Sequence, residues 1–577
     1  MEMRKKYLME NRVPLLLILA VSLLLAVRSF FSFSWSDESF YLTMVHRFWL
    51  GERMFVDEWY TTQLSTPLIL PFYTFYQWLM EGNEGIYLYF RLLYCGICGI
   101  TALFCYLKLR ESLSALTALL CTLVYLFYSR ANIGGMSYYN MTLTLVLLAT
   151  ILLYSGLKKG KLKGIKLFFV GILLALAVLY TPFLSIPYIA IFGGMLLNQR
   201  GRRRWREILT VICATAITAV VYLSYIFSKV ELKEILFNIP YVLNEPELQK
   251  TNPFLAVPVI FLRIAWRYKW TIIPYISIFI MVFYKNRKKE KLSVKQNKWI
   301  LIANIIIFSV NYYLSRDMIG CVNIALVLLG GIVLYTYYEN EDKERITLLT
   351  FGLAGISMVF AFTFSSDTGL DAMTIGFVPL AMMCIILMLQ NKKIKSKKIV
   401  YQMMVSVVLF VILQTAELRL VSVYRDAPLN QLDTMITSGP AKYLYTTKEH
   451  EEQYITLKED ILQNVREDDK VFFSKNCFWT YLCVENEYGV PSSWRVGLDS
   501  PRLEEYFSLN PEKIPTCVFV VKPEYGSFQS SMIQNNEKAD RPNENKTEGF
   551  LYEYMMENNY EIIETESAIV YRKKNLN

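Results

Sequence analysis

The chain has 577 residues, of which 54% are hydrophobic and 15% are aromatic, and its mean hydropathy is +0.30. It contains repeated apolar runs of about 16 to 22 residues, the length that crosses a bilayer core, so this composition excludes an ordinary soluble protein. The net charge of +10 is concentrated between the apolar runs, which is typical of membrane topology and not of nucleic-acid binding.

We predict a polytopic α-helical membrane protein with about thirteen transmembrane helices. The first, Val13–Phe31, follows a basic stretch and is not followed by a small-residue cleavage site, so we expect an uncleaved span with a cytoplasmic N-terminus. The further predicted spans are Ile86–Leu107, Leu113–Tyr128, Tyr138–Tyr154, Leu167–Tyr180, Pro182–Leu197, Ile208–Phe227, Trp270–Tyr284, Trp299–Leu314, Met318–Tyr338, Ile346–Phe364, Ala372–Leu389 and Ile399–Ala416.

One apolar stretch, Pro67–Leu79, is not expected to cross the membrane. If it did, all the later basic loops would move to the outer face, against the retention of Lys and Arg on the cytoplasmic side. We therefore predict that it lies at the outer interface, or dips in and returns, within one long external loop covering about residues 33–85. Residues Asn252 to Lys269 are expected to form an amphipathic helix at the same surface.

After Ala416 the chain becomes charged and contains no further span. We therefore divide it into a transmembrane catalytic domain, residues 1–418, and an extracytoplasmic α/β domain, residues 419–577. Alternation and propensity predict helices at Tyr454–Val465 and Glu548–Glu557, strands at Lys470–Ser474 and Thr516–Val521, and a closing hairpin formed by Tyr560–Thr565 and Ala568–Arg572. Cys477 and Cys483 could pair in an oxidising compartment, although we favour free thiols.

Two adjacent acids, Asp37 and Glu38, stand where the first span ends. Ionised groups at a membrane boundary are costly unless they are paired or used, so both are functional candidates, the alternative being that they only mark a helix end. Asp57 and Glu58 follow in the same loop. They could bind a divalent cation such as Mg²⁺ or Mn²⁺, or hold the loop through hydrogen bonds, which we favour.

The first external loop resembles that of the GT-C superfamily of membrane glycosyltransferases, above all the branch of protein O-mannosyltransferases and aminoarabinose transferases. The residues that carry the resemblance are Asp37-Glu38, Tyr41, Gly51, Phe55-Val-Asp57 and Ser65-Thr-Pro67-Leu68, with Arg91 and Tyr128-Ser129-Arg130 further on. The usable motifs cover Val13 to Leu197. This chain departs from the pattern after the Ser-Arg pair, where many relatives carry an Asp and it offers Asn132, Ser137 and Asn140. It also departs at Thr181-Pro182, where relatives often carry a Lys.

This resemblance implies an inverting glycosyltransferase that moves a sugar from a polyprenyl-phosphate donor to a hydroxyl of a glycan, lipid or protein at the outer face. Asp37 would be the general base, and Glu38 would shape the loop or orient the acceptor. The departing phosphate calls for cations, and our donor phosphate-binding candidates are Arg91, Arg130, Arg263, Arg267 and Arg316. The Lys-, Ile- and Asn-rich composition favours a bacterial plasma membrane and a role in the cell envelope.

Three alternatives fit parts of the pattern. A multi-span transporter or flippase of lipid-linked sugars would also have many spans, but such proteins often carry internal repeats and broken helices, and no repeat is visible here. A polysaccharide polymerase or ligase would depend on a long late external loop, whereas here the first loop carries the acids. A scaffold that presents the C-terminal domain would have no catalytic carboxylate.

Overall fold

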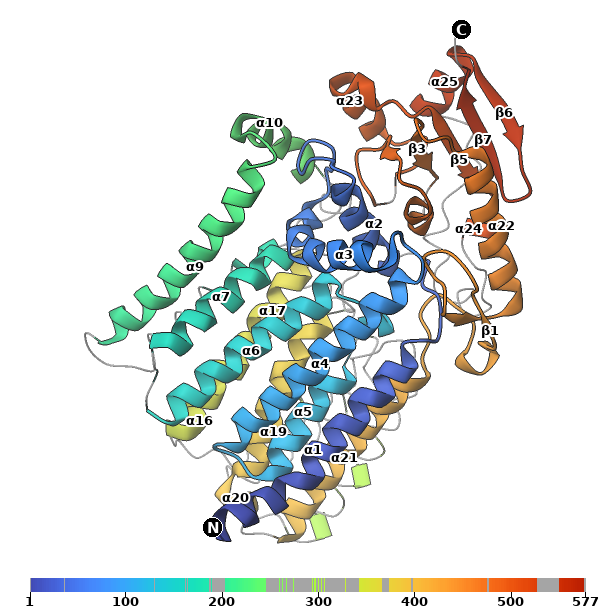
Figure 1. Cartoon of the computed structure of the whole chain (residues 1–577). Coiled ribbons are helices and arrows are strands. Elements are labelled where there is room, and N and C mark those ends of the chain that lie inside the picture. The colour runs from blue at the N-terminus through green and yellow to red at the C-terminus, as the bar shows by residue number, and fades with distance from the viewer. Residues whose placement is uncertain are drawn as a thin grey trace.

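The computed structural model describes residues 2–35, 37–128, 130–160, 164–185, 203–244, 342–365, 373–395, 398–474, 477–494, 496–526 and 549–574, with isolated positions between them. These residues form a bundle of long helices with an α/β region at one end (Figure 1). Several predictions lie outside them. These are the amphipathic helix Asn252–Lys269, the spans Trp270–Tyr284, Trp299–Leu314 and Met318–Tyr338, and most of Pro182–Leu197.

Within the described residues, six helices are long and apolar enough to cross a membrane, and three further apolar helices are shorter. Each coincides with a predicted span, but a total of about thirteen is not confirmed. The long ones are α1 (Glu2–Arg28), α4 (Ile86–Arg110), α6 (Tyr138–Lys158), α9 (Arg203–Phe227), α21 (Lys398–Val421) and the run of α16 (Asp342–Thr347), the π-helical turn η4 (Leu348–Gly352) and α17 (Leu353–Ser365). The shorter ones are α5 (Ala115–Phe127), α7 (Gly164–Tyr180) and α19 (Phe377–Gln390), which the turn η5 (Thr374–Gly376) precedes.

Small residues allow several of these helices to pack closely. A Cβ added at Gly171 of α7 would lie 2.6 Å from the Cβ of Ala214 on α9. Gly355 of α17 and Gly376 of η5 face each other in the same way, since a Cβ on either would lie within 2.7 Å of the other's carbonyl oxygen. Glycine and alanine at helix contacts are typical of packing in membranes, where close backbone approach replaces the hydrophobic drive.

The loop that we predicted to be external, residues 33–85, is more helical than we expected. Residues Asp37–Trp49 form α2, and after the turn η1 (Thr61–Ser65) residues Thr66–Met80 form α3, which runs across the end of the bundle (Figure 1). The 15 residues of α3 extend only about 22 Å at 1.5 Å per residue, short of a hydrocarbon core of about 30 Å. The equally short α5 and α19 run along the bundle, so that the Pro67–Leu79 stretch does not cross the membrane stays a prediction.

The C-terminal region is built on a five-stranded mixed sheet with the order β4-β3-β5-β7-β6. Strands β3 (Lys470–Phe473) and β5 (Cys517–Val521) are parallel, and the antiparallel hairpin of β6 (Tyr560–Glu564) and β7 (Ala568–Lys573) completes one edge. The predicted strands, hairpin and helices are confirmed, the helices being α22 (Lys448–Asn464) and α25 (Phe550–Glu557). Elements that were not predicted include α10 (Leu232–Leu243), β4 (Glu487–Tyr488), α23 (Pro501–Leu509) and the small ladder of β1 (Thr434–Met435) with β2 (Tyr445–Thr446).

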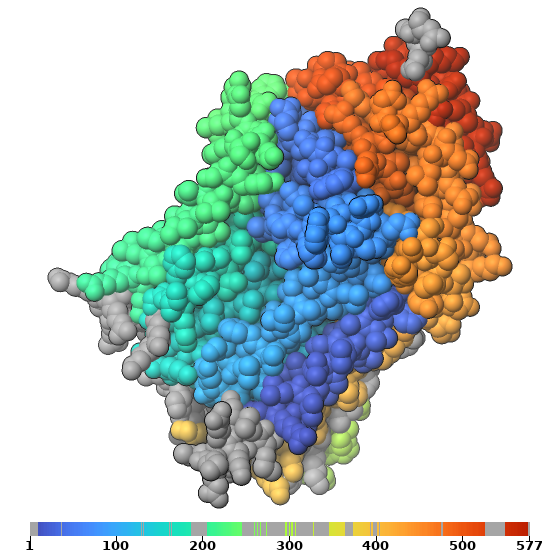
Figure 2. All heavy atoms as spheres, viewed as in Figure 1, coloured from blue at the N-terminus to red at the C-terminus, as the bar shows by residue number. Residues whose placement is uncertain are grey.

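The first external loop is wedged between α10 and the C-terminal region, as the blue surface in Figure 2 shows. Trp59 of this loop stacks on Tyr241 of α10 at 4.8 Å and meets Tyr506 of α23 edge-on at 5.0 Å. The loop is thus held on two sides by segments far from it in sequence.

Cys477 and Cys483 are free thiols, so the disulfide alternative is wrong and our preference for thiols holds.

Candidate active site

Asp37 and Glu38 are the first two residues of α2, and the helix turns their side chains in different directions. Successive residues of an α-helix are rotated by about 100° around its axis, so neighbouring side chains diverge. The side chain of Glu38 is 1% exposed, whereas that of Asp37 is 23% exposed. Acidic groups in a first turn also interact favourably with the positive end of the helix dipole. The sequence pair is therefore two separate sites.

Glu38 is engaged with Arg91, the residue that we expected to contact a donor phosphate. Arg91 donates from Nε to Glu38 Oε1 at 2.6 Å and from Nη2 to Oε2, and its Nη1 donates to the carbonyl oxygens of Ser29 and Ser32, both at 2.9 Å. All of this lies in the protein interior, where a charge requires a partner. The structure thus gives Arg91 the role of neutralising Glu38 and tying α4 to α2 and the end of α1, a different role from the expected one.

Asp37 is approached by two residues that directly follow the last long helix, α21. The Tyr424 hydroxyl donates to Asp37 Oδ2 at 2.5 Å, and Arg425 Nη1 lies 3.8 Å from the same oxygen. Arg425 has a φ of 54°, in the left-handed region, and its guanidinium lies 5.0 Å from the ring centre of Trp35. Burial raises the pKa of the Tyr424 hydroxyl, and the neighbouring Asp37 carboxylate raises it further, so this group stays a donor.

Arg130 is the second cation near Asp37. Its guanidinium lies 3.8 Å from the ring centre of Tyr139. Burial by itself would lower the pKa of Arg130, but Tyr139 and then Tyr138, followed by Asp37, raise it above its ordinary value, so the group remains charged.

Asn132 explains how Arg130 and Arg425 come to the same place. Its side-chain amide donates to the carbonyl oxygens of Arg419 at 3.0 Å and Ser422 at 2.6 Å, and Arg419 donates back to its Oδ1. This cross-link ties the segment between α5 and α6 to the end of α21. The residue that departs from the family pattern is thus a structural anchor here.

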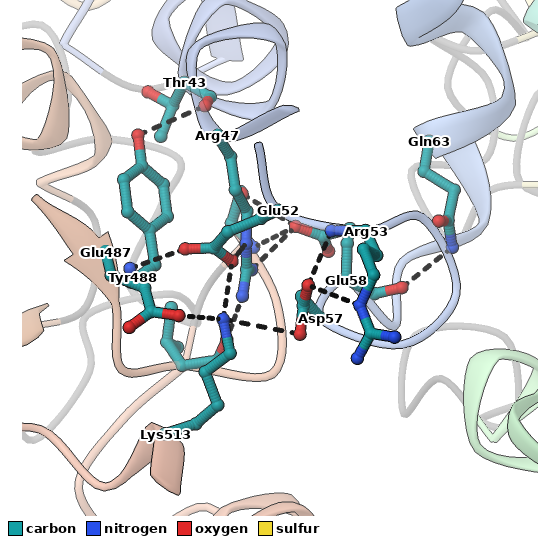
Figure 3. Close-up of polar contacts among 12 residues, drawn as sticks. Thr43, Arg47, Glu52, Arg53, Asp57, Glu58, Gln63, Glu487, Tyr488 and Lys513 are labelled. Carbon is teal, nitrogen blue, oxygen red and sulfur yellow. Dashed lines mark hydrogen bonds and ion pairs between the residues drawn. The ribbon is translucent and has the colours of Figure 1, made fainter. Parts of the chain in front are cut away.

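Asp57 and Glu58 belong to a different cluster, in which side chains of the loop meet side chains of the C-terminal region (Figure 3). Arg47, fully buried on α2, donates to Glu52 at 2.5 Å and to Glu58 at 3.1 Å. Lys513 Nζ lies 3.4 Å from Asp57 Oδ1, 3.6 Å from Glu52 and 2.6 Å from Glu487.

These contacts are the ones that the loop-holding alternative requires. A divalent cation does not fit at Asp57 and Glu58, because Arg47 and Lys513 already supply the positive charge there. In the described part of the chain, no group of three or more His, Cys, Asp or Glu side chains is arranged to hold a metal.

Of the predicted site residues that the structure describes, Glu38 pairs with Arg91, Asp57 and Glu58 share the buried cluster, and Asp37 interacts electrostatically with Arg130. Arg263, Arg267 and Arg316 lie outside the described residues. Tyr424 and Arg425 were missed by our sequence reasoning. Their signal was an aromatic residue and a cation placed a few residues after the last apolar span, at the boundary where we predicted that the first loop lies.

No model of a known protein family matches this chain, and no curated protein sequence matches it. Among solved structures, it is similar to an oligosaccharyltransferase of Archaeoglobus fulgidus crystallised with zinc and sulfate, with a TM-score of 0.49 and 12% identity over 88% of this chain and 67% of that chain. The apo form gives a TM-score of 0.45 at 12% identity over 88% and 69% of the two chains. The complex with an inhibitory peptide and a dolichol-phosphate gives 0.44 at 12% identity over 87% and 69%. Likeness at this level does not establish a family, so we infer function from the geometry around Asp37.

Proposed function

We propose that this chain is a GT-C-type membrane glycosyltransferase that moves a sugar from a polyprenyl-phosphate donor to a hydroxyl acceptor, with Asp37 as the general base. The observation that carries the proposal is a contrast among four carboxylates. Glu38, Asp57 and Glu58 are buried against cations, whereas Asp37 keeps solvent contact and lies near Arg130 and Arg425. A base must reach the proton that it removes, and only Asp37 has this access.

The chemistry assigns a part to each of these groups. The acceptor oxygen attacks the anomeric carbon on the face opposite the phosphate, its proton passes to Asp37, and the phosphate leaves with the electrons of the broken C–O bond. The configuration at that carbon is therefore inverted. Arg130 and Arg425 are the cations that would stabilise the departing phosphate, and Tyr424 holds the carboxylate in place.

The same proposal includes a topology. The basic segments between the apolar helices would lie in the cytoplasm together with the N-terminus. The first external loop and the region after residue 418 would then lie outside a bacterial plasma membrane, where a lipid-linked donor and a glycan, lipid or protein acceptor of the cell envelope could meet. Reactivity tests with membrane-impermeant thiol reagents on single-cysteine variants at Asp433 and Lys158 would check it, since only the first is expected to react from outside.

The central experiment uses the purified full chain with a panel of synthetic short-chain polyprenyl-phosphate sugars. Loss of donor and appearance of glycosylated product are followed for the wild type, Asp37→Asn and the control Asp433→Asn, an exposed acid of the C-terminal region. We expect Asp37→Asn to lose about 10³-fold in turnover while it still binds donor, because general-base catalysis is worth about 10² to 10⁴. Equal turnover in the wild type and Asp37→Asn would refute the base. Donor movement across vesicles without any chemical transfer would instead support a flippase.

A further inference from the structure

An aromatic cluster lies on the same face of α2 as Asp37. Phe40, Met44 and Phe48 follow Asp37 at spacings of three, four and four residues, which places all four side chains along one side of the helix. Phe40 and Met44 pack there against Phe478 of the C-terminal region, with Phe48, Tyr60 and Trp494 around them. The stripe that begins with the proposed base therefore continues into rings supplied by a distant part of the chain.

Two of these rings reach the surface beside Asp37. Phe40 and Phe478 are buried, whereas Tyr60 and Trp494 are half-buried. The Trp494 ring lies 4.7 Å from that of Phe40 and 5.0 Å from that of Phe478, and the Phe40 and Tyr60 rings are 5.1 Å apart. Phe40 lies one turn along α2 from Asp37, on the same side of the helix, so Trp494 packs on the helix face that begins with the proposed base.

The position of Trp494 is set by the buried cluster of Figure 3. Arg47 Nη2 donates to the carbonyl oxygen of Val490 at 2.7 Å, and the Trp59 amide donates to that of Pro491 at 2.7 Å. Glu58 Oε2 accepts from the amide and the hydroxyl of Ser493 at 2.8 and 2.7 Å. Because Arg47 and Glu58 are fully buried, the segment 490–493 is held rigidly against the loop, and the next residue is Trp494. The buried Arg47 and Glu58 thus fix the position of Trp494, whose ring packs on Phe40 of the helix that begins with Asp37.

A series of aromatic side chains leads from Tyr60 to Arg130. Tyr60 interacts electrostatically with Tyr138, whose ring centre lies 3.9 Å from that of Tyr139 in a tilted arrangement, and the Arg130 guanidinium lies over the Tyr139 ring. A molecule resting on Tyr60 and Trp494 would therefore lie on the helix face that begins with the proposed base, and these contacts connect Tyr60 with the cation proposed for the phosphate.

We propose that Trp494 and Tyr60 form a pyranose-binding subsite beside Asp37, so that the C-terminal region takes part in recognising the sugar. The face of an aromatic ring is electrically negative, and the axial C–H bonds of a pyranose present a weakly positive, apolar face that fits it. The Tyr60 hydroxyl can also hydrogen-bond a sugar hydroxyl. This inference rests on the proposed glycosyl transfer for its biological sense, but sugar binding can be measured without turnover.

The test is saturation-transfer NMR on the full chain in lipid nanodiscs prepared without sugar-based detergent. The probes are the methyl pyranosides of mannose, galactose and N-acetylglucosamine. The variants are Trp494→Ala, Trp494→Phe and Trp494→Leu. The matched control is Tyr552→Ala, which removes a half-buried ring of the same region whose partner is Tyr571, at 6.2 Å.

We expect at least one pyranoside to bind the wild type and the control through its axial protons. Its dissociation constant should rise about tenfold in Trp494→Ala and Trp494→Leu and about threefold or less in Trp494→Phe, since the effect follows the aromatic face. Displacement by a short-chain polyprenyl-phosphate sugar would identify the donor as the source of the ring, and binding alongside it would identify the acceptor. Unchanged binding in Trp494→Ala, or no pyranoside binding to the wild type, would overturn the subsite. If pyranosides bind and no donor is ever consumed, the proposed reaction fails and the subsite stands.

Discussion

At its C-terminal end, α2 presents Arg47 to Glu52 and Glu58 in a site closed to solvent, and at its N-terminal end it presents Asp37 to Tyr424 and Arg425 with the carboxylate still in contact with solvent. Both ends are joined to distant parts of the chain by charged groups. The buried end holds a geometry, because its carboxylates lie against Arg47 and Lys513 with side chains that are almost fully buried. The open end can exchange a proton. Structure and reactivity are thus divided between the two ends of one short helix.

This division predicts that Arg47→Met has the largest effect on folding. The change leaves Glu52 and Glu58 buried without their main partner, which costs about 3–5 kcal/mol. We expect little folded protein by size-exclusion chromatography and a large fall in the midpoint of thermal unfolding. Arg53→Met is the matched control, because Arg53 is 43% exposed and surface ion pairs are worth about 0–1 kcal/mol. If both variants unfold like the wild type, the closed cluster does not hold the loop.

His46, next to Arg47, predicts a pH dependence of stability at the same closed end. It lies 2.8 Å from the Val484 carbonyl oxygen and 2.7 Å from the Tyr73 hydroxyl, and burial lowers its pKa to about 4. Between pH 6.5 and 4 the unfolded chain binds a proton that the folded chain does not, so the free energy of unfolding falls as the pH is lowered, by about 3 kcal/mol in all. Above pH 6.5 the imidazole is neutral in both states, so this stability is fully retained.

The measurement is thermal or chemical unfolding at several pH values for the wild type and His46→Gln. The variant has a lower stability at pH 7, since it loses the imidazole contacts, but its stability should decline less steeply between pH 6.5 and 4. Parallel curves for the two proteins would show that groups other than His46 cause the loss of stability at acidic pH.

Much of the helical bundle, but little of the candidate site, could be predicted from the sequence. Spans such as Tyr138–Tyr154 could be predicted because length and hydropathy are local properties, and the hairpin of β6 and β7 could be predicted from alternation. The divergence of Asp37 and Glu38 could not, because it depends on α2 beginning at Asp37 within what we expected to be a loop. The contact of Tyr424 with Asp37 joins residues 387 positions apart, and no local pattern records such a pair.

At the open end, Arg130→Gln and Arg425→Gln should lower activity and leave the fold intact. Charge-assisted hydrogen bonds are worth about 1.5–3 kcal/mol, so we expect kcat/KM for the donor to fall by about 10- to 100-fold in each. The experiment compares KM and kcat over a range of donor concentrations, with thermal unfolding measured in parallel. A lower midpoint of thermal unfolding without a change in kcat/KM would assign these arginines to packing. Arg425→Lys, which keeps the charge, should recover part of the activity.

Tyr424→Phe should have the smallest effect, because two consequences of losing its hydroxyl oppose each other. The Asp37 carboxylate loses a donor that stabilises its ionised form and so gains basicity, but it also loses the contact at 2.5 Å that fixes its direction. We expect kcat to fall by about fivefold, the equivalent of roughly 1 kcal/mol, with the donor KM unchanged. A loss beyond a hundredfold would give the hydroxyl a part in proton transfer, and the open end of α2 would then hold a tyrosine–aspartate pair where we have placed a single base.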